Sequence, residues 1–220
     1  MHLQVCKTLK KKGIGENVAQ LVFENITLNT PSLILAPLSS AHRIDLLKSA
    51  ADGELWNLWF TNVPSENTID SYLEAALEQR EAGTSLPFVV QHKATGQIIG
   101  TTRFCNADLK NKRLEIGYTW YAKSYQRSSV NTECKLAMLT YAFETLQVIA
   151  VEFRTHWHNQ ASRNAILRLG AKQDGVLRQH QKQADGAYRD TVVFSILNNE
   201  WPTVKKGLEH KLSSHALIKQ

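Results

Sequence analysis

Residues 125–135, YQRSSVNTECK, form a polar loop that lacks glycine and proline and leads into an amphipathic helix. The apolar period predicts this helix from about Thr132 to Gln147. Its buried side would consist of Leu136, Leu139, Phe143 and Leu146. The first amides of a helix have no partner within the helix, and together with the helix dipole they attract anions. The stretch therefore has the form of a phosphate-binding turn, although Ser129 and Asn131 stand where glycine is usual. An ordinary turn capped by Asn131 and Thr132 is the other interpretation.

Strands and helices alternate on both sides of this loop. Runs rich in β-branched and aromatic residues predict strands at 33–38, 112–122 and 148–157, a hairpin at 86–104 through Gly96, and a last hairpin, 171–181 with 188–197, around Asp185 and Gly186. Helical spacing predicts helices at 39–52, 66–83 and 162–170, with apolar sides that include Ile44, Leu46 and Leu47 in the first and Ile69, Leu73, Ala76 and Leu77 in the second. Gly83 and Gly170 are the expected helix stops. The pattern predicts one domain, a mixed α/β fold with helices on both faces of a sheet.

The positive net charge lies at the two ends of the chain. The 220 residues carry a net charge of +6, but four lysines precede residue 13 and four follow residue 204. Between these ends Lys and Arg are balanced by Asp and Glu. A nucleic-acid groove would need clustered cations within the domain, so nucleic acid is not the expected partner.

The chain also lacks signals for membranes, metals and disulfides. No apolar run approaches the roughly 18 residues that span a bilayer, and the start of the chain is too polar for a signal peptide. Cys6, Cys105 and Cys134 are odd in number and far apart, so we expect reduced, packing cysteines. We therefore expect a cytoplasmic protein without membrane contact, and either a monomer or a homodimer.

Four motifs, in this order, resemble the GNAT family of acyl-CoA-dependent N-acetyltransferases and, more narrowly, its ribosomal-protein alanine and serine N-acetyltransferase branch. They are LEIGYTWYA, YQRSSVNTECKLAMLTYAFETL, VEFRTHWHNQASRNAILRLGA and the ending DGVLRQH with DGAYRDTVVFSIL and a following EW. The resemblance implies a mixed, mostly antiparallel central sheet flanked by helices. It implies a domain over 31–208 between an N-terminal extension, 1–30, and a C-terminal tail, 209–220, that we expect to be frayed.

The resemblance also implies acetyl-CoA as the acetyl donor, and we expect no metal because no set of ligands stands at a recognisable spacing. The family pattern Q/R-x-x-G-x-G/A matches Gln126, Arg127, Ser128, Ser129, Val130 and Asn131, with both small positions altered, and Thr132 follows. Backbone amides can still bind pyrophosphate, and Asn131 is a common substitute where a left-handed conformation is needed. Strand amides around Tyr118, Trp120 and Tyr121 would meet the thioester. Asn159 matches a pantetheine-binding position, and a simple turn asparagine is the alternative.

Acetyl transfer to an amine requires a base and a leaving group. At pH 7 removing a proton costs about 1 kcal/mol for an α-amine and about 4 to 5 kcal/mol for a lysine, so a modest base suffices for N-termini. Glu115 is the candidate base because strand alternation places it opposite Leu114, Ile116, Tyr118 and Trp120. A purely structural pairing with a cation such as Arg103 is the alternative.

The resemblance places the acid at the start of the helix at 162–170. The family's usual acidic tyrosine corresponds to Ile166, and the branch's serine corresponds to Ser162, which could equally be a helix-start residue. A thiol leaves readily near neutral pH, so a weak acid or water suffices.

Aromatic residues and a histidine are the candidates for the acceptor side. Trp56, Trp59 and Phe60 fall where the family's first helices line the acceptor site, and a core plug is the alternative. His156 could line the same site, and His156 with His158 lacks a third metal ligand at a recognisable spacing. We expect an N-acetyltransferase that attacks directly in a ternary complex, with a primary amine, such as a protein N-terminus, as the acceptor. A non-catalytic acyl-CoA-binding module is the alternative, and an RNA- or ribosome-binding protein ranks last.

Overall fold

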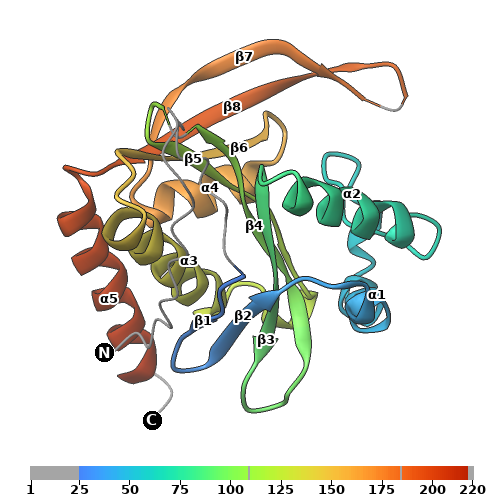
Figure 1. Cartoon of the computed structure of the whole chain (residues 1–220), viewed down its shortest axis with the longest axis horizontal. Helices are drawn as coiled ribbons and strands as arrows, with labels where there is room; N and C mark the ends of the chain where they lie inside the picture. The colour runs from blue at the N-terminus through green and yellow to red at the C-terminus, as the bar shows by residue number, and fades with distance from the viewer. Residues whose placement is uncertain (1–24, 109, 184, 218–220) are drawn as a thin grey trace, which may run out of the picture.

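An eight-stranded sheet forms the centre of the computed structural model, which describes residues 25–108, 110–183 and 185–217 (Figure 1). The strand order is β1-β2-β3-β4-β5-β6-β8-β7, and every neighbouring pair is antiparallel except β5 and β6. The strands are β1 Leu28–Asn29, β2 Leu33–Pro37, β3 Ser85–His92, β4 Ile98–Asp108, β5 Arg113–Tyr121, β6 Ala150–His156, β7 Lys172–Lys182 and β8 Tyr188–Leu197. The prediction of a mixed, mostly antiparallel sheet is confirmed.

Helices cover both faces of this sheet (Figure 1). The helices are α1 Arg43–Ala51, α2 Ile69–Glu81, α3 Val130–Thr140, α4 Gln160–Leu169 and α5 Trp201–Leu217. A large buried cluster joins the sheet to α3, α4 and α5, and a smaller one joins its other face to α1 and α2. The face of the sheet that packs against α3, α4 and α5 is called the α3 face below, and the face that packs against α1 and α2 is called the α2 face.

The helix after the polar loop begins earlier than predicted. The N-cap of α3 is Ser129, and after Thr140 the chain continues as a π-helical segment, Tyr141–Thr145. The alternative interpretation, in which Asn131 and Thr132 cap the helix, is therefore wrong, because both residues already lie within its first turn. The predicted apolar side is largely correct, since Leu136, Leu139 and Phe143 are buried.

Two expectations about packing are also wrong. Ile44 was expected on the buried side of α1, but it is 62% exposed while Leu46 is completely buried. The C-terminal tail, 209–220, was expected to be frayed, but α5 continues to Leu217, and Leu212 packs against the large cluster on the α3 face. The basic N-terminal lysines and Cys6 lie outside the described residues.

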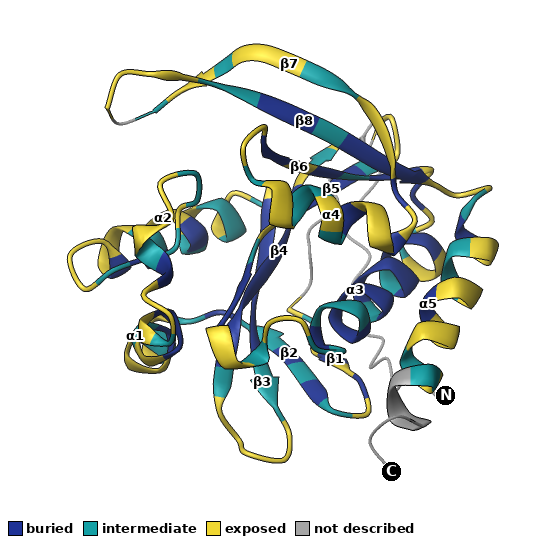
Figure 2. Ribbon diagram, turned by 180° about the vertical axis from the view of Figure 1, so that it is seen from behind, coloured by how far each residue is buried: buried dark blue, intermediate teal, exposed yellow. Residues whose placement is uncertain are grey.

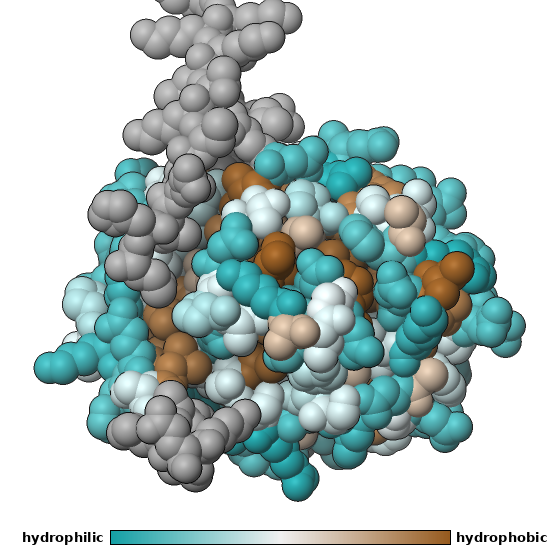
Figure 3. Space-filling model, turned by 90° about the horizontal axis from the view of Figure 1, so that it is seen from below, coloured by the Kyte–Doolittle hydropathy of each residue, from teal (hydrophilic) through white to brown (hydrophobic). Residues whose placement is uncertain are grey.

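Within the described chain, no helix combines the length and apolar character that crossing a bilayer requires. The face drawn in Figure 3 shows several separate hydrophobic areas among hydrophilic ones.

On the opposite side from α1, the β7–β8 hairpin extends beyond the other strands, and most residues of β7 are exposed (Figure 2).

A bulge interrupts β5 at Tyr118. Trp120 pairs with Thr101 and Gly117 pairs with Arg103, so β5 has one residue more than β4 between these pairs. Tyr118 has a φ of 50°, in the left-handed region. An extra residue reverses the alternation of side chains beyond it.

Because of the bulge, the side chains of β5 beyond Gly117 do not lie on the predicted faces of the sheet. Leu114 and Ile116 pack in the cluster on the α3 face, whereas Trp120 packs in the cluster on the α2 face. The prediction that Tyr118 and Trp120 share the side of Leu114 and Ile116 is therefore wrong. The prediction that Glu115 faces away from Leu114 and Ile116 is correct.

The two parallel strands part soon after they meet. The β5–β6 pairing consists of Arg113 with Ala150, Leu114 with Val151 and Glu115 with Glu152. Beyond Glu115, β5 remains paired with β4 as far as Tyr121, while β6 remains paired with β8 as far as His156. The backbone of β5 after Glu115 is therefore free of β6 on its outer edge.

Candidate active site

The polar loop places a helix N-terminus next to the free edge of β5. The Gln126 side chain donates from Nε2 to the Tyr121 carbonyl at 2.9 Å, and Ser128 Oγ donates to the Tyr125 carbonyl at 2.6 Å. Ser128 Oγ also accepts from the Val130 amide at 3.3 Å. These contacts fix the loop directly after the end of β5.

The residue with a left-handed backbone in this loop is Arg127, at φ 57°. The expectation that Asn131 takes that conformation is wrong, because Asn131 is helical. Ser129, with φ −70°, is also in the right-handed region. Neither position therefore needs glycine for its backbone angles, and Arg127 bears the strain that a left-handed conformation imposes on a residue with a Cβ.

The first turn of α3 retains free donors. The Glu133 amide is bonded to the Ser129 carbonyl, but the amides of Ser129, Asn131 and Thr132 have no partner within the described chain. Unpaired amides at the positive end of a helix dipole are the usual site for a phosphate group. The loop therefore fits the pyrophosphate of a coenzyme, with Val130 buried beneath it and Arg127 exposed beside it.

Glu115 is buried on the α2 face, at the point where β5 and β6 part. Its Oε2 accepts from Asn106 Nδ2 at 2.8 Å, and the same oxygen lies 3.5 Å from Arg154 Nε. Burial raises the pKa of Glu115, although the Asn106 hydrogen bond and the Arg154 charge oppose this. The cation that pairs with Glu115 is thus Arg154, and the alternative partner Arg103 is wrong.

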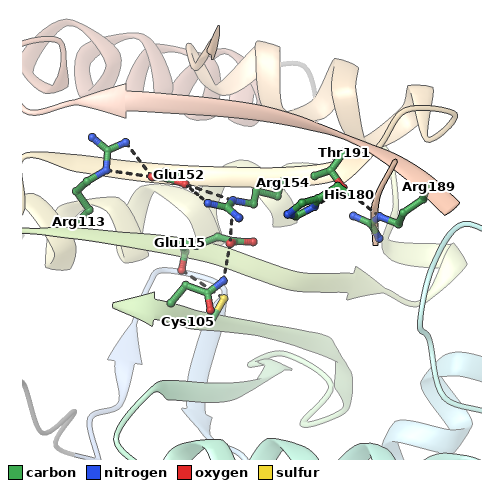
Figure 4. A network of polar contacts seen from close by, with 9 residues as sticks. Cys105, Arg113, Glu115, Glu152, Arg154, His180, Arg189 and Thr191 are labelled. Atoms are coloured by element: carbon green, nitrogen blue, oxygen red, sulfur yellow. Dashed lines mark hydrogen bonds and ion pairs between the residues drawn. The ribbon is translucent and has the colours of Figure 1, made fainter. Parts of the chain in front are cut away.

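A second carboxylate lies across from Glu115 (Figure 4). Glu152 binds Arg113 Nη2 at 2.8 Å and Arg154 Nη2 at 2.9 Å. Burial alone would raise the pKa of Glu152, but the two guanidinium groups hold it below its ordinary value. The neighbouring carboxylates therefore have pKa values displaced in opposite directions, a common arrangement at sites of proton transfer.

Gly117 leaves room beside the carboxylate. A Cβ at this position would lie 3.1 Å from Glu115 Oε1 and 3.3 Å from Cys105 Sγ. Contacts this short force the neighbouring group to move. Glycine at this position thus leaves the Glu115 carboxylate room to keep its observed position.

Asn159 and Ser162 lie together at the start of α4. Asn159 is the N-cap, and its Oδ1 accepts from the Ser162 amide at 3.0 Å. The half-buried Ser162 hydroxyl forms no hydrogen bond within the described chain. Ile166, at the family's tyrosine position, is buried in the large cluster. Ser162 is thus the residue with a free hydroxyl here, while Asn159 has one side-chain atom occupied by capping.

The aromatic candidates divide into two groups. The Trp59 ring lies 5.0 Å from His156, and Phe60 lies 6.5 Å from the same ring. Trp56 instead packs against the small cluster on the α2 face, as the core-plug alternative expects. Three of the four acceptor-site candidates are therefore brought together at the end of β6.

The Nδ1 atom of His156 is a hydrogen-bond acceptor. It accepts from the His158 amide at 3.0 Å, and the buried Nε2 of the same ring has no partner within the described chain. Burial lowers the pKa of His156, and Arg189 and His158 lower it further, while the Gln183 side chain and the Asp190 charge oppose this. The described residues contain no group of three His, Cys, Asp or Glu side chains arranged to hold a metal ion.

The structure adds a buried cation that the sequence analysis missed. Lys135 is 4% exposed, and its Nζ donates to Thr102 at 2.9 Å and to Thr119 at 2.6 Å, directly beneath the bulge. Burial lowers the pKa of Lys135 to about 8, although the neighbouring thiols oppose this. The sequence did contain a signal for the burial of Lys135. It precedes the buried Met138 and Leu139 by three and four residues, and residues at this spacing share one side of a helix.

Comparisons with known proteins give a consistent result. Residues 32–172 match the family model described as an acetyltransferase (GNAT) domain. The chain is 32% identical over 106 residues to the "Putative ribosomal N-acetyltransferase YdaF" of Bacillus subtilis. That match covers 48% of this chain and 57% of YdaF, so it spans little more than half of this relative's length.

Solved structures resemble nearly the whole described chain. A GCN5-related N-acetyltransferase from Brucella melitensis matches with a TM-score of 0.75 and 27% identity, over 85% of each chain. Mycobacterium smegmatis RimJ, in complex with CoA-disulfide, matches with a TM-score of 0.69 and 21% identity, over 84% of this chain and 92% of RimJ. At that identity RimJ shares the fold with this chain, and its structure contains a CoA derivative.

Proposed function

Because this chain belongs to the GNAT acetyltransferase family, we propose that it transfers the acetyl group of acetyl-CoA to a primary amine, and that the amine is an α-amine such as a protein N-terminus. The observation that carries the proposal is the parting of β5 and β6 at Glu115, beside a helix N-terminus with free amides. A donor held at α3 and along the free edge of β5 would present its thioester to the α2 face, where Glu115 lies. The name of the relative YdaF, a ribosomal N-acetyltransferase, supports a protein acceptor.

Glu115 is the proposed base. Burial raises the pKa of Glu115 toward the pH at which an α-amine loses its proton. The Asn106 hydrogen bond and Arg154 hold the carboxylate in place through one oxygen, Oε2. The other oxygen, Oε1, has no hydrogen-bond partner in the described chain and is free to accept a proton from an amine.

The edge of β5 is the proposed site of charge stabilisation. Acetyl-CoA supplies the activated acetyl group. The amides of β5 beyond Glu115 that point away from β4 have no partner on β6, so they can donate to the oxygen that becomes negative when an amine attacks the acetyl carbonyl. Lys135 adds a buried positive charge beneath the same segment. The Ser162 hydroxyl, or water, is the proposed source of the proton that the departing thiolate takes up.

The test is titration of acetyl-CoA into the purified protein, followed by assay of CoA release with peptides that have free N-termini. Ser129→Glu places a negative charge at the N-cap of α3 and should abolish binding, whereas Ser213→Glu, on the exposed side of α5, should not. Binding with CoA release supports the proposal. Binding without release from any amine would favour a non-catalytic acyl-CoA-binding module, and no binding would contradict both.

A further inference from the structure

Arg103 is a buried cation without a counter-ion. It lies on β4, is 2% exposed, and forms no ion pair with any residue that the structure describes. Its Nε has no hydrogen-bond partner, and Nη1 reaches only Gln79 Oε1, at 3.5 Å. Buried guanidinium groups are ordinarily paired with a carboxylate, so this one lacks the anion that usually accompanies such a charge.

Two tyrosine rings enclose this guanidinium group. The Arg103 Cζ lies 4.1 Å from the centre of the Tyr118 ring and 4.9 Å from that of Tyr72. Tyr118 is the bulge residue, and without the bulge its side chain would lie on the opposite face of the sheet. Tyr118 is 45% exposed and has a strained backbone at φ 50°. Tyr118, the more exposed of the two rings, is therefore the one whose rotation would uncover Arg103.

Arg103 lies close to the proposed base. In the β4–β5 register Arg103 pairs with Gly117 and Cys105 pairs with Glu115, so Arg103 and Glu115 are diagonal neighbours on the α2 face. Diagonal neighbours in a sheet are about 7 Å apart. A small group bonded near the reacting amine would therefore reach Arg103 when the amine is at Glu115.

A second unpaired arginine, Arg189, lies on the side of Glu115 formed by β8. Arg189, on β8, is half-buried and donates from Nε to Thr191 Oγ1 at 3.1 Å, but forms no ion pair within the described chain. Its charge acts on Glu115 and on Tyr118. By contrast, Arg113 and Arg154 are both paired with Glu152. Of the four arginines on β4, β5, β6 and β8 near Glu115, Arg103 and Arg189 are therefore the two without an ion pair in the described chain.

We propose that Arg103, with Arg189 opposite, binds a carboxylate of the acceptor after the Tyr118 ring turns aside. The acceptor is then a primary amine that carries a carboxylate a few bonds from its nitrogen. This inference rests on the proposed function and specifies its acceptor class. Two sources share this chemistry, namely a free amino acid with its α-carboxylate and a peptide whose first residue is Asp or Glu.

The test compares acidic acceptors with neutral ones of the same shape. Peptides that begin with Asp or Glu are paired with peptides that begin with Asn or Gln, and free amino acids are paired with their amides. For the wild-type protein we expect kcat/KM to be at least about thirtyfold higher for the acidic member of one pair type, because a buried charge pair is involved. The pair type that shows the preference identifies the source of the carboxylate.

Variants connect the preference to the arginines. Arg103→Met should bring the ratio of kcat/KM for the acidic acceptor to kcat/KM for the neutral acceptor close to one, with the affinity for acetyl-CoA unchanged. Arg189→Gln, at a less buried position, should lower the same ratio. Arg168→Met, on the exposed side of α4, is the matched control and should keep it. If Arg103→Met does not fold, the wild-type comparison and Arg189→Gln still decide. Equal rates for acidic and neutral acceptors would overturn this inference alone, whereas no acetyl-CoA binding and no turnover with any amine would overturn the proposed function as well.

Discussion

Glu115 and Glu152 lie opposite each other in the strand register, at the last position where β5 and β6 are neighbours, and Arg154 contacts both carboxylates. The pKa of Glu115 is raised by its burial, while the guanidinium groups around Glu152 lower the pKa of that residue. The opening of the sheet and the candidate base therefore occur at the same place. This coincidence motivates the predictions about catalysis.

Glu115→Gln removes the proposed base but keeps the side-chain shape. We expect kcat/KM at pH 7 to fall by about 100-fold, a typical contribution of a general base. The loss should become smaller toward pH 9, because the α-amine is then already deprotonated. In the wild-type protein the rate should rise as the pH increases through the raised pKa of Glu115, since the base must be ionised.

The measurement is the pH profile of CoA release for both proteins. Glu74→Gln, on the exposed side of α2, is the control and should match the wild type. An unchanged rate in Glu115→Gln at every pH would contradict the assignment of the base.

Gly117→Ala tests the space beside the carboxylate. Because the added Cβ would lie 3.1 Å from Glu115 Oε1, the carboxylate must move. We expect kcat to fall by about tenfold or more, since small displacements of catalytic groups are costly, with the affinity for acetyl-CoA retained. Gly175→Ala is the control, because a Cβ there would meet nothing within 4 Å. Equal kcat values for the two variants would argue against a positional requirement at Glu115.

Lys135 makes the stability of the protein dependent on pH in the alkaline range. Its pKa is lowered to about 8 by burial, so above that pH the unfolded chain binds a proton that the folded chain does not. The unfolded state then binds more protons, and the free energy of unfolding rises with pH. Relative to Lys135→Met, the wild-type protein should gain about 3 kcal/mol between pH 8 and pH 10.5, where the unfolded lysine titrates. Urea denaturation across this pH range measures the difference. The prediction is contradicted if the free energy of unfolding changes with pH in the same way for the wild type and for Lys135→Met.

Trp201 fixes the start of α5 to the rest of the domain. Its ring stacks on Phe143 at 5.3 Å, and its Nε1 donates to Glu144 Oε1 at 2.9 Å. We expect Trp201→Ala to lower the free energy of unfolding by about 3 to 5 kcal/mol, as for other buried tryptophans. Trp201→Phe keeps an aromatic ring and loses one hydrogen bond, so it should cost about 1 to 2 kcal/mol. Thermal or urea unfolding measures both, and an unaffected Trp201→Ala would show that α5 does not contribute to the stability of the domain.

Local patterns predict the elements well where the chain is regular. The alternation of Leu114, Glu115 and Ile116 predicts both the strand and the face of Glu115, because side chains in a regular strand alternate strictly. The same rule fails at Tyr118, since a bulge inserts one residue and tyrosine gives no signal for a left-handed backbone. In the loop, Asn131 was expected to be left-handed, but Arg127 takes that conformation.

The sequence by itself determined the order and type of the main strands and helices between residues 33 and 197, the helix N-terminus after the polar loop, and the presence of a carboxylate on the strand before it. These features depend on residues within one or two turns or pleats of each other, where period and residue type act directly. Only the tertiary structure decided that Arg154 pairs with Glu115, that Tyr118 covers Arg103, and that Lys135 lies beneath the bulge. Each of these contacts joins segments from different elements, and burial together with strand register, which no local pattern specifies, sets their charges and their distances.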